Sequence, residues 1–209
     1  MTSVRLFASV IFVLTALGQC FAAAASPDTS AMLLDLMKNR DRSIQKIVSS
    51  DTRGETDSER KQLKDLVGAL FDFHRYSKIA LGRYWDKRSE AEQAEFADLC
   101  RRLIEKNYAD PKLYTKSDRI DYISAEVDGN EGVVRTVVYY KSEQSSIDYQ
   151  LHLVDGNWLV YDMVIDDLSV ARNNRSQFRR EIRKTSYEGL VSKLRDKLAE
   201  QAGDEKDGE

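Results

Sequence analysis

The sequence has few of the residues that usually mark a catalytic, metal-binding or multidomain protein. Its 209 residues include two prolines, two cysteines and two histidines, and its ten glycines are scattered. Because there is no proline-rich linker, we expect one folded domain. The scattered glycines form no phosphate-binding loop, and G-x-S-x-G, H-x-x-x-H and C-x-x-C motifs are missing. The sequence therefore offers no catalytic or metal-binding constellation, and binding is the default function.

A long apolar run occurs only near the N-terminus, where it has the features of an export signal. Arg5 precedes the mostly apolar run 6–17, which is too short to span a bilayer, and small residues follow at 22–25. We predict a signal peptide over residues 1–25, cleaved after Ala24 or Ala25. The protein is therefore expected to leave the cytoplasm.

The cysteines leave one alternative open and exclude an internal disulfide. Cys20 lies in the sequence Leu17-Gly18-Gln19-Cys20, which resembles a lipidation site, although glutamine is large for the position before the cysteine. Lipidation would also export the protein. If Cys20 leaves with the signal, Cys100 has no disulfide partner within the chain. Cys100 lies on the apolar face of a predicted helix, so we interpret it as a buried small hydrophobe rather than a nucleophile.

The charge balance disfavours nucleic acid as a partner. Loss of Arg5 with the signal leaves 31 basic and 35 acidic residues, a net charge of −4. Proteins that bind nucleic acid usually carry a basic excess on the binding domain. We therefore expect no nucleic acid partner.

Apolar residues at helical spacing predict helices before and after the middle of the chain. Asp72 is the expected N-cap of a short helix that Gly82 ends. Two capping boxes are expected, Ser89 with Glu92 and Thr185 with Glu188. The predicted helices cover residues 28–49, 57–71, 73–81, 89–109, 169–184 and 186–201. The charged tail, residues 202–209, has nothing to bury and is expected to be disordered.

The middle of the chain changes from helical periodicity to alternation, which predicts four strands. They cover 120–127, 133–141, 147–154 and 158–165, and Asp-Gly-Asn turns separate the first from the second and the third from the fourth. Short turns imply an antiparallel meander, and the helices must cover its apolar face. The last strand should be apolar on both faces, with Trp158, Val160 and Val164 on one face and Leu159, Tyr161, Met163 and Ile165 on the other. The fold class is thus α+β, a twisted four-stranded antiparallel sheet covered by N-terminal and C-terminal helices.

Three features have both a structural and a functional interpretation. Asp166 and Asp167 are interpreted as a turn or cap, because neighbouring strand residues point to opposite faces and cannot act together as acid and base. The aromatic segment 71–85 is either a core corner between helices or part of a ligand pocket wall. An arginine stripe is either a solvated helix face or a contact for an anionic head group or an acidic partner. Its members are Arg172, Arg175, Arg179 and Arg183.

Two blocks of sequence carry a family resemblance. The block 71–108, FDFHRYSKIALGRYWDKRSEAEQAEFADLCRRLIEKNY, resembles the pattern FDF…LG.YW……Q..EF…C/F..L…Y. The block 158–178, WLVYDMVIDDLSVARNNRSQF, resembles WxVYDVxIEGVSLVxNYRxQF. Both patterns belong to the MlaC family, also called toluene-tolerance auxiliary proteins. The sequence departs from them at Asp166, Asp167 and Asn174, where the family has Glu, Gly and Tyr.

The resemblance implies a fold and a function. The fold would be NTF2-like, with helices that enclose an apolar cavity, over residues 26–201. The function would be that of a periplasmic phospholipid carrier, without cofactor or catalytic residues. It would shuttle lipid between an outer-membrane lipoprotein–porin complex and an inner-membrane ABC transporter with an MCE-domain subunit, and so maintain outer-membrane lipid asymmetry. We expect a monomer. The alternatives are an NTF2-like enzyme and a module that binds another amphiphile, such as a hopanoid or an isoprenoid.

The expected lipid contacts are apolar side chains where helices face the sheet. The sequence does not separate cavity wall from ordinary core among them. The candidates are Leu70, Phe71, Ile79, Tyr84, Trp85, Leu103, Tyr108, Val138, Tyr149, Leu151, Met163 and Val170. Candidates for partner docking are Arg172, Arg175 and Arg179.

Overall fold

The computed structural model describes residues 27–48, 57–108 and 119–204. The predicted signal peptide and the expected connections 50–56 and 112–118 lie outside these ranges. Among the described residues, no helix is both long and apolar enough to cross a membrane. The elements, in chain order, are α1 (Pro27–Val48), α2 (Asp57–Leu70), α3 (Phe73–Leu81), the 3₁₀ helix η1 (Gly82–Lys87), α4 (Glu90–Tyr108), β1 (Arg119–Asp128), β2 (Glu131–Tyr140), β3 (Glu143–Val154), β4 (Asn157–Ile165), β5 (Leu168–Ser169), α6 (Val170–Lys184) and α7 (Tyr187–Asp204).

The strands form one open antiparallel sheet in the order β1-β2-β3-β4-β5. This confirms the α+β class and the antiparallel meander, but the sheet has five strands rather than four. The fifth, β5, consists of two residues that pair with the end of β4. Two residues are too few to show an alternating pattern, so periodicity could not predict this strand.

Tight turns connect the strands, and two of them agree with the sequence. The Gly129 and Gly156 turns fall where the Asp-Gly-Asn motifs predicted them, and both glycines have positive φ. The turn between β2 and β3 differs from the prediction, because it contains only Lys141 and Ser142. Strand β3 therefore begins at Glu143, four residues before the predicted start. The segment 143–146 is polar at an outer hairpin, so alternation could not reveal it.

The acidic pair after β4 is a turn, as interpreted from the sequence. Asp166 and Asp167 both have positive φ, 47° and 66°, and both are exposed. The Asp166 carboxylate accepts a hydrogen bond from the Ser146 backbone N–H at 2.9 Å. The pair thus reverses the chain between β4 and β5 and joins it to the start of β3.

A β-bulge in β4 changes which side chains share a face. Leu151 lies opposite Val160, whereas Gln150 lies opposite Asp162, so Tyr161 is an extra residue in the strand. Val160 and Met163 therefore face the same side, with Leu151 and Tyr149 on the neighbouring strand. The predicted assignment of Val160 and Met163 to opposite faces was wrong, because simple alternation assumes an unbroken ladder.

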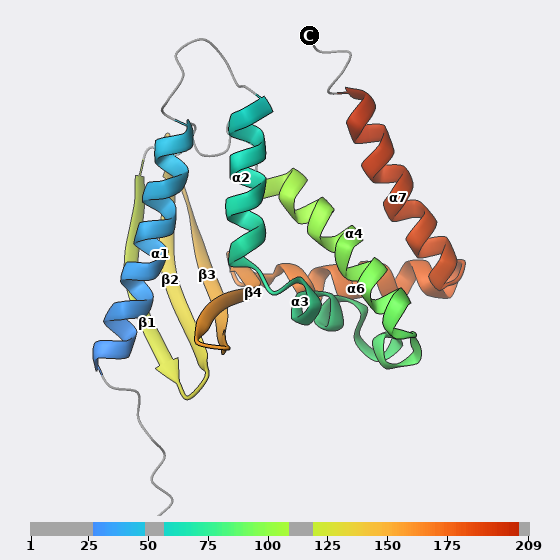
Figure 1. Cartoon of the computed structure of the whole chain (residues 1–209), viewed down its shortest axis with the longest axis horizontal. Coiled ribbons are helices and arrows are strands. Elements are labelled where there is room, and N and C mark those ends of the chain that lie inside the picture. The colour runs from blue at the N-terminus through green and yellow to red at the C-terminus, as the bar shows by residue number, and fades with distance from the viewer. Residues whose placement is uncertain (1–26, 49–56, 109–118, 205–209) are drawn as a thin grey trace, which may run out of the picture.

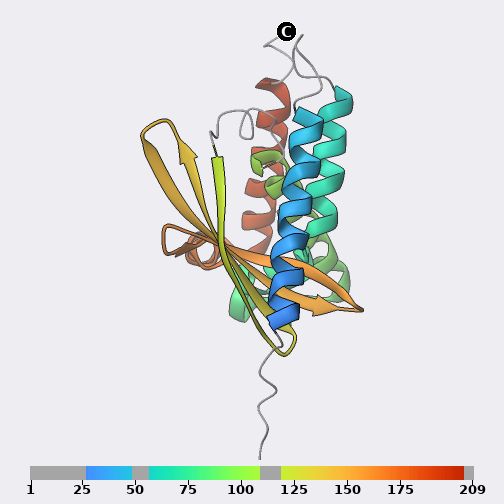
Figure 2. The same cartoon turned by 90° about the vertical axis from the view of Figure 1, so that its left-hand side faces the viewer.

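The helices divide into two groups around the sheet. Helix α1 packs on β1 and β2, with α2 beside it (Figure 1). The close approach of α1 needs Gly132, because a Cβ there would lie 2.6 Å from Leu33 Cδ2. Helices α3, α4, α6 and α7 form a second group next to β4 and β5 (Figure 2). One hydrophobic core, which includes Leu33 and Phe178, runs through both groups.

The structure confirms three of the four helix caps that the sequence predicts. Asp72 accepts from the Arg75 N–H at 2.8 Å, Gly82 ends α3 with φ 56°, and Ser89 and Glu92 form a reciprocal capping box. The fourth, Thr185 with Glu188, was wrong, since the Thr185 hydroxyl donates to the Glu181 carbonyl at the end of α6. Ser186 caps α7 instead and accepts from the Gly189 N–H at 3.1 Å. Helix α7 continues to Asp204, three residues past its predicted end.

Candidate functional site

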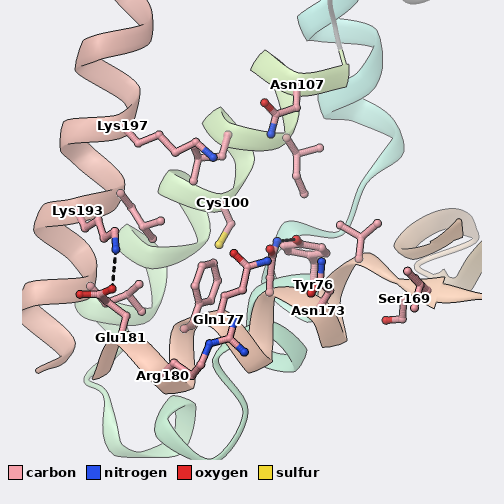
Figure 3. Close-up of a pocket in the computed structure, with 18 of the residues that line it drawn as sticks. Tyr76, Cys100, Asn107, Ser169, Asn173, Gln177, Arg180, Glu181, Lys193 and Lys197 are labelled. Atoms are coloured by element: carbon pink, nitrogen blue, oxygen red, sulfur yellow. Dashed lines mark hydrogen bonds and ion pairs between the residues drawn. The ribbon is translucent and has the colours of Figure 1, made fainter. Parts of the chain in front are cut away.

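An open cavity of about 1070 Å³ lies between α4, α6 and α7 and extends to the ends of β4 and β5 (Figure 3). Its volume is slightly above the range of about 300–1,000 Å³ that is common for small-molecule sites. The floor is mostly apolar and buried, whereas the rim carries amides and charges. The main floor residues are Tyr76, Cys100, Leu103, Ile104, Ile165, Val170, Phe178, Leu190 and Leu194.

One side of α6 forms a wall of the cavity. Val170, Asn174, Gln177, Glu181 and Lys184 recur three or four residues apart, so they lie on one face of the helix. Helix α6 also has a strongly amphipathic sequence, with Ala171 and Phe178 buried in the core. One face of α6 therefore lines the cavity, and other faces of the same helix are exposed to solvent.

A buried carboxylate fixes the start of α6 against the sheet. Asp162 on β4 is 5% exposed and accepts hydrogen bonds from the Ala171 and Met163 backbone N–H groups, each at 2.9 Å. Its other oxygen accepts from the Ser169 hydroxyl at 2.5 Å, while Ser169 accepts from the Arg172 N–H. A negative charge is stabilised near a helix N-terminus. Asp162 thus positions the cavity wall without lining the cavity.

The floor contains few reactive groups. Burial raises the pKa of the Cys100 thiol to about 12, so the thiol is neutral near pH 7. The Tyr76 hydroxyl accepts a hydrogen bond from the Asn174 amide at 2.5 Å. The hydrogen bond between Tyr76 and Asn174 joins α3 to α6, and the neutral Cys100 thiol is not activated as a nucleophile.

The rim combines side-chain amides with charges of both signs. Lys193 and Glu181 form an ion pair at 2.6 Å, and a hydrogen bond from Lys193 holds the pKa of Glu181 below its usual value. Lys197 extends from α7 towards α4, where Asn107 lies (Figure 3). Arg180 lies on the α6 side. This arrangement suits an amphiphile with an apolar body in the floor and a polar end at the rim.

The two histidines have structural contacts away from the cavity. His152 Nε2 lies 2.8 Å from Asp72 Oδ2, and its ring packs edge-on against Tyr161. His74 packs edge-on against Trp85. Within the described part of the chain, no group of three or more His, Cys, Asp or Glu residues is arranged to hold a metal ion.

The predicted lipid contacts are dispersed in the structure. Leu103 and Val170 line the cavity. Five others are buried in the core and three more are partly buried against it, while Val138 is half-buried on β2. The side chain of Tyr108 lies outside the described residues. The buried five are Leu70, Phe71, Trp85, Leu151 and Met163, and the three are Ile79, Tyr84 and Tyr149. All twelve remain predictions as lipid contacts.

Sequence reasoning missed most of the cavity wall. The cavity residues Ile104, Phe178, Leu190 and Leu194 all fall within predicted helices, but none of them is among the predicted lipid contacts. The signal available was the apolar stripe of the last helix, which needs a partner surface. The docking candidates Arg172, Arg175 and Arg179 are exposed on α6 and do not line the cavity.

Comparison with known proteins supports the fold and identifies the family. A solved phospholipid-binding protein from Ralstonia solanacearum, in complex with a phospholipid, has a similar structure with a TM-score of 0.66. The two sequences are 23% identical, and the match covers 83% of this chain and 98% of the other. No curated protein matches the chain. The family model described as MlaC protein matches residues 38–196, which is most of the sequence, and the chain therefore belongs to the MlaC family.

Proposed function

We propose that this protein is a periplasmic phospholipid carrier that holds acyl chains in the cavity between α4, α6 and α7. The observation that carries the proposal is the large apolar floor bordered by polar groups, in a chain of the MlaC family. The phospholipid complex of the structurally similar Ralstonia protein supports the same ligand class. The Asn107, Asn173 and Gln177 amides and Lys197 are suitable partners for a head group at the rim.

The physical requirement for such a carrier is an apolar cavity rather than a catalytic group. Transfer of each methylene from water to an apolar site is favourable by about 0.8 kcal/mol, so a sixteen-carbon chain contributes roughly 12 kcal/mol. A lipid leaves a bilayer slowly because this free energy is lost in water. An apolar cavity offsets this free energy, so transport needs no catalytic group. The neutral Cys100 thiol and the packing contacts of His74 and His152 agree with this requirement.

The route of transport follows from family membership as a proposal. The carrier would exchange lipid with an outer-membrane lipoprotein–porin complex and with the MCE-domain subunit of an inner-membrane ABC transporter. The export signal predicted at residues 1–25 supports a periplasmic location. Co-purification with each partner from cross-linked membranes is the direct measurement.

Cargo is tested by solvent extraction and mass spectrometry of the purified mature protein. We expect about one phospholipid per chain, or uptake from liposomes. A purified protein that contains no phospholipid and takes none up from liposomes would contradict the proposal. A hopanoid or an isoprenoid in the extract would identify that amphiphile, rather than phospholipid, as the cargo. Substrate turnover without bound lipid would favour the enzyme alternative.

Matched variants locate the cargo. Leu103→Glu and Val170→Glu place a carboxylate at half-buried cavity positions, and burial of an unpaired charge is costly, so occupancy should fall at least tenfold. Ile44→Glu is the control, because Ile44 on α1 is also half-buried but neither lines the cavity nor belongs to the predicted lipid contacts. Equal losses in all three variants would contradict this location.

A further inference from the structure

A strongly basic surface lies on the side of α6 that faces away from the cavity. We define the basic face as Arg83 on η1 and Arg175, Arg179 and Arg183 on α6, all exposed. Helix α6 contains six Arg or Lys and one Glu, a net charge of +5. Together α3 and η1 contain four and one, a net of +3, although the whole chain is at −3. Positive charge is therefore concentrated on these adjoining elements.

The structure holds the four arginines together. Helix α6 packs directly on α3, and the two lie side by side across one end of the helical group (Figure 1). The Arg175 side chain lies against Gly82, where an added Cβ would be 2.6 Å from Arg175 Nε. Arg83 donates to the Tyr84 hydroxyl at 3.1 Å, and the charges of Arg83, Arg179 and Arg183 all contribute to lowering the Tyr84 pKa.

Among the described residues, the arginines of the basic face have no acidic partners, in contrast to several arginines elsewhere. Arg75 pairs with Glu131, Arg101 with Asp98 and Glu105, and Arg135 with Glu126. No carboxylate of the described residues forms an ion pair with any of the four arginines of the basic face. The basic face therefore keeps its full charge available for an external anion.

The basic face is separate from the cargo site. At 100° per residue, Arg175 and Arg179 each lie about 160° around α6 from Gln177, which lines the cavity, and Arg183 lies about 120° from it. A head group at the Gln177 part of the rim would therefore lie on the other side of α6 from Arg175 and Arg179. An anion bound at Arg175 and Arg179 would therefore be distinct from a head group at this rim.

The shape and composition of this surface favour a membrane over a protein. A specific protein interface usually has an apolar core. The exposed large apolar residues of the described chain are Met32, Ile123, Tyr140 and Leu168, none of which is on α3, η1 or α6. A row of guanidinium groups four residues apart along one helix instead suits an array of phosphates, which arginine binds in bidentate geometry. Tyr84, half-buried among them, is a residue type enriched at membrane–water interfaces.

We propose that the basic face docks this protein on an anionic phospholipid membrane surface. The contact is electrostatic and peripheral, and it does not use the cavity. Each basic residue at an anionic surface changes the partition coefficient by about fivefold, so removal of three charges should weaken binding on the order of a hundredfold. Salt should weaken it as well, because exposed charges are screened.

The test is sedimentation of the mature protein with vesicles. We expect binding to vesicles of phosphatidylcholine with phosphatidylglycerol in 25 mM salt, little binding to pure phosphatidylcholine, and loss of binding in 500 mM salt. The triple variant Arg83→Gln, Arg179→Gln, Arg183→Gln should bind the anionic vesicles about a hundredfold more weakly than the wild type does. It spares Arg175, which packs on Gly82. The control, Arg42→Gln, Lys46→Gln, Arg102→Gln, removes three exposed cations elsewhere and should bind as the wild type does.

Several results would overturn the proposal. They are absence of wild-type binding to the anionic vesicles, equal losses in variant and control, and binding that persists in high salt. Binding to immobilised polyglutamate without binding to vesicles would overturn it in favour of an acidic protein. The phospholipid content of the variant should equal that of the wild type, and loss of cargo in the variant would show that the two sites are not separate. If the wild type, the arginine variant and the control all lack phospholipid but the wild type binds the anionic vesicles, the carrier proposal is rejected and the membrane-docking proposal stands.

Discussion

Replacement of Asp162 by alanine should be among the most damaging single substitutions in this protein. The carboxylate is buried, and it accepts from two backbone N–H groups, Met163 and Ala171, and from the Ser169 hydroxyl. Alanine removes both acceptor oxygens and all three hydrogen bonds, and so leaves the donors without partners. A hydrogen bond to a charged group contributes about 1.5–3 kcal/mol, and a buried donor left unsatisfied costs about 1–3 kcal/mol.

These contributions overlap, so we expect a loss of about 4 kcal/mol in the free energy of unfolding. Asp162→Asn keeps the shape and one acceptor oxygen but removes the charge at the α6 N-terminus, and should cost about 2 kcal/mol. Urea unfolding measures both values. In thermal unfolding, about 4 kcal/mol corresponds to a decrease in Tm of roughly 8–16 °C for a chain of this length.

The control for this substitution is Asp167→Asn. Asp167 is exposed and has φ 66°, a conformation that asparagine also tolerates, so the change should be below about 0.5 kcal/mol. A cost below about 1 kcal/mol for Asp162→Ala would refute the reasoning. Such a result would mean that water or a neighbouring group replaces the carboxylate.

Three further predictions concern packing, titration and capping. Gly132→Ala should destabilise by about 1–3 kcal/mol in urea unfolding, because its Cβ would meet Leu33 at 2.6 Å and Trp158 at 3.1 Å, and a wild-type midpoint would contradict the close packing of α1. Stability should fall as pH rises from 9 towards 12, since burial raises the pKa of Cys100 and of Tyr187 to about 12 and the folded state then binds more protons than the unfolded state. Iodoacetamide at pH 8 should accordingly label Cys100 only after unfolding. Ser186→Ala should cost about 1 kcal/mol and Thr185→Ala less, and the reverse order would restore the predicted capping box.

Local sequence signals were enough for the turns and most caps. These features depend only on residues a few positions apart in the chain, so a short sequence motif is enough to predict them. Examples are the turns at Gly129 and Gly156 and the capping box of Ser89 and Glu92. The choice between Thr185 and Ser186 was wrong because both are good N-caps. It depends on where α6 ends, and the sequence pattern does not fix a helix end to one residue.

Longer-range features could not be predicted in the same way. The bulge at Tyr161 exists only as a pairing between β3 and β4, and no residue of β4 signals it alone. Cavity membership of Leu194 or Ile104 depends on the distance between α7 and α4, which apolar periodicity does not contain. Leu103 and Leu99 have the same character in one helix, yet only Leu103 borders the cavity. The sequence therefore identified apolar faces but not the gap between them.

Helix α6 connects these observations because its three faces have different partners. Phe178 packs in the core beneath the cavity floor, Gln177 lies at the cavity rim, and Arg179 faces solvent, although the three residues are consecutive. Asp162 holds the helix at its N-terminus, so a change there should disturb the cavity wall and the basic face together. Surface substitutions at Arg179 and Arg183 should instead leave the cavity intact. Comparison of Asp162→Asn with the arginine variant, for cargo content and vesicle binding, therefore separates the position of α6 from the charge that it carries.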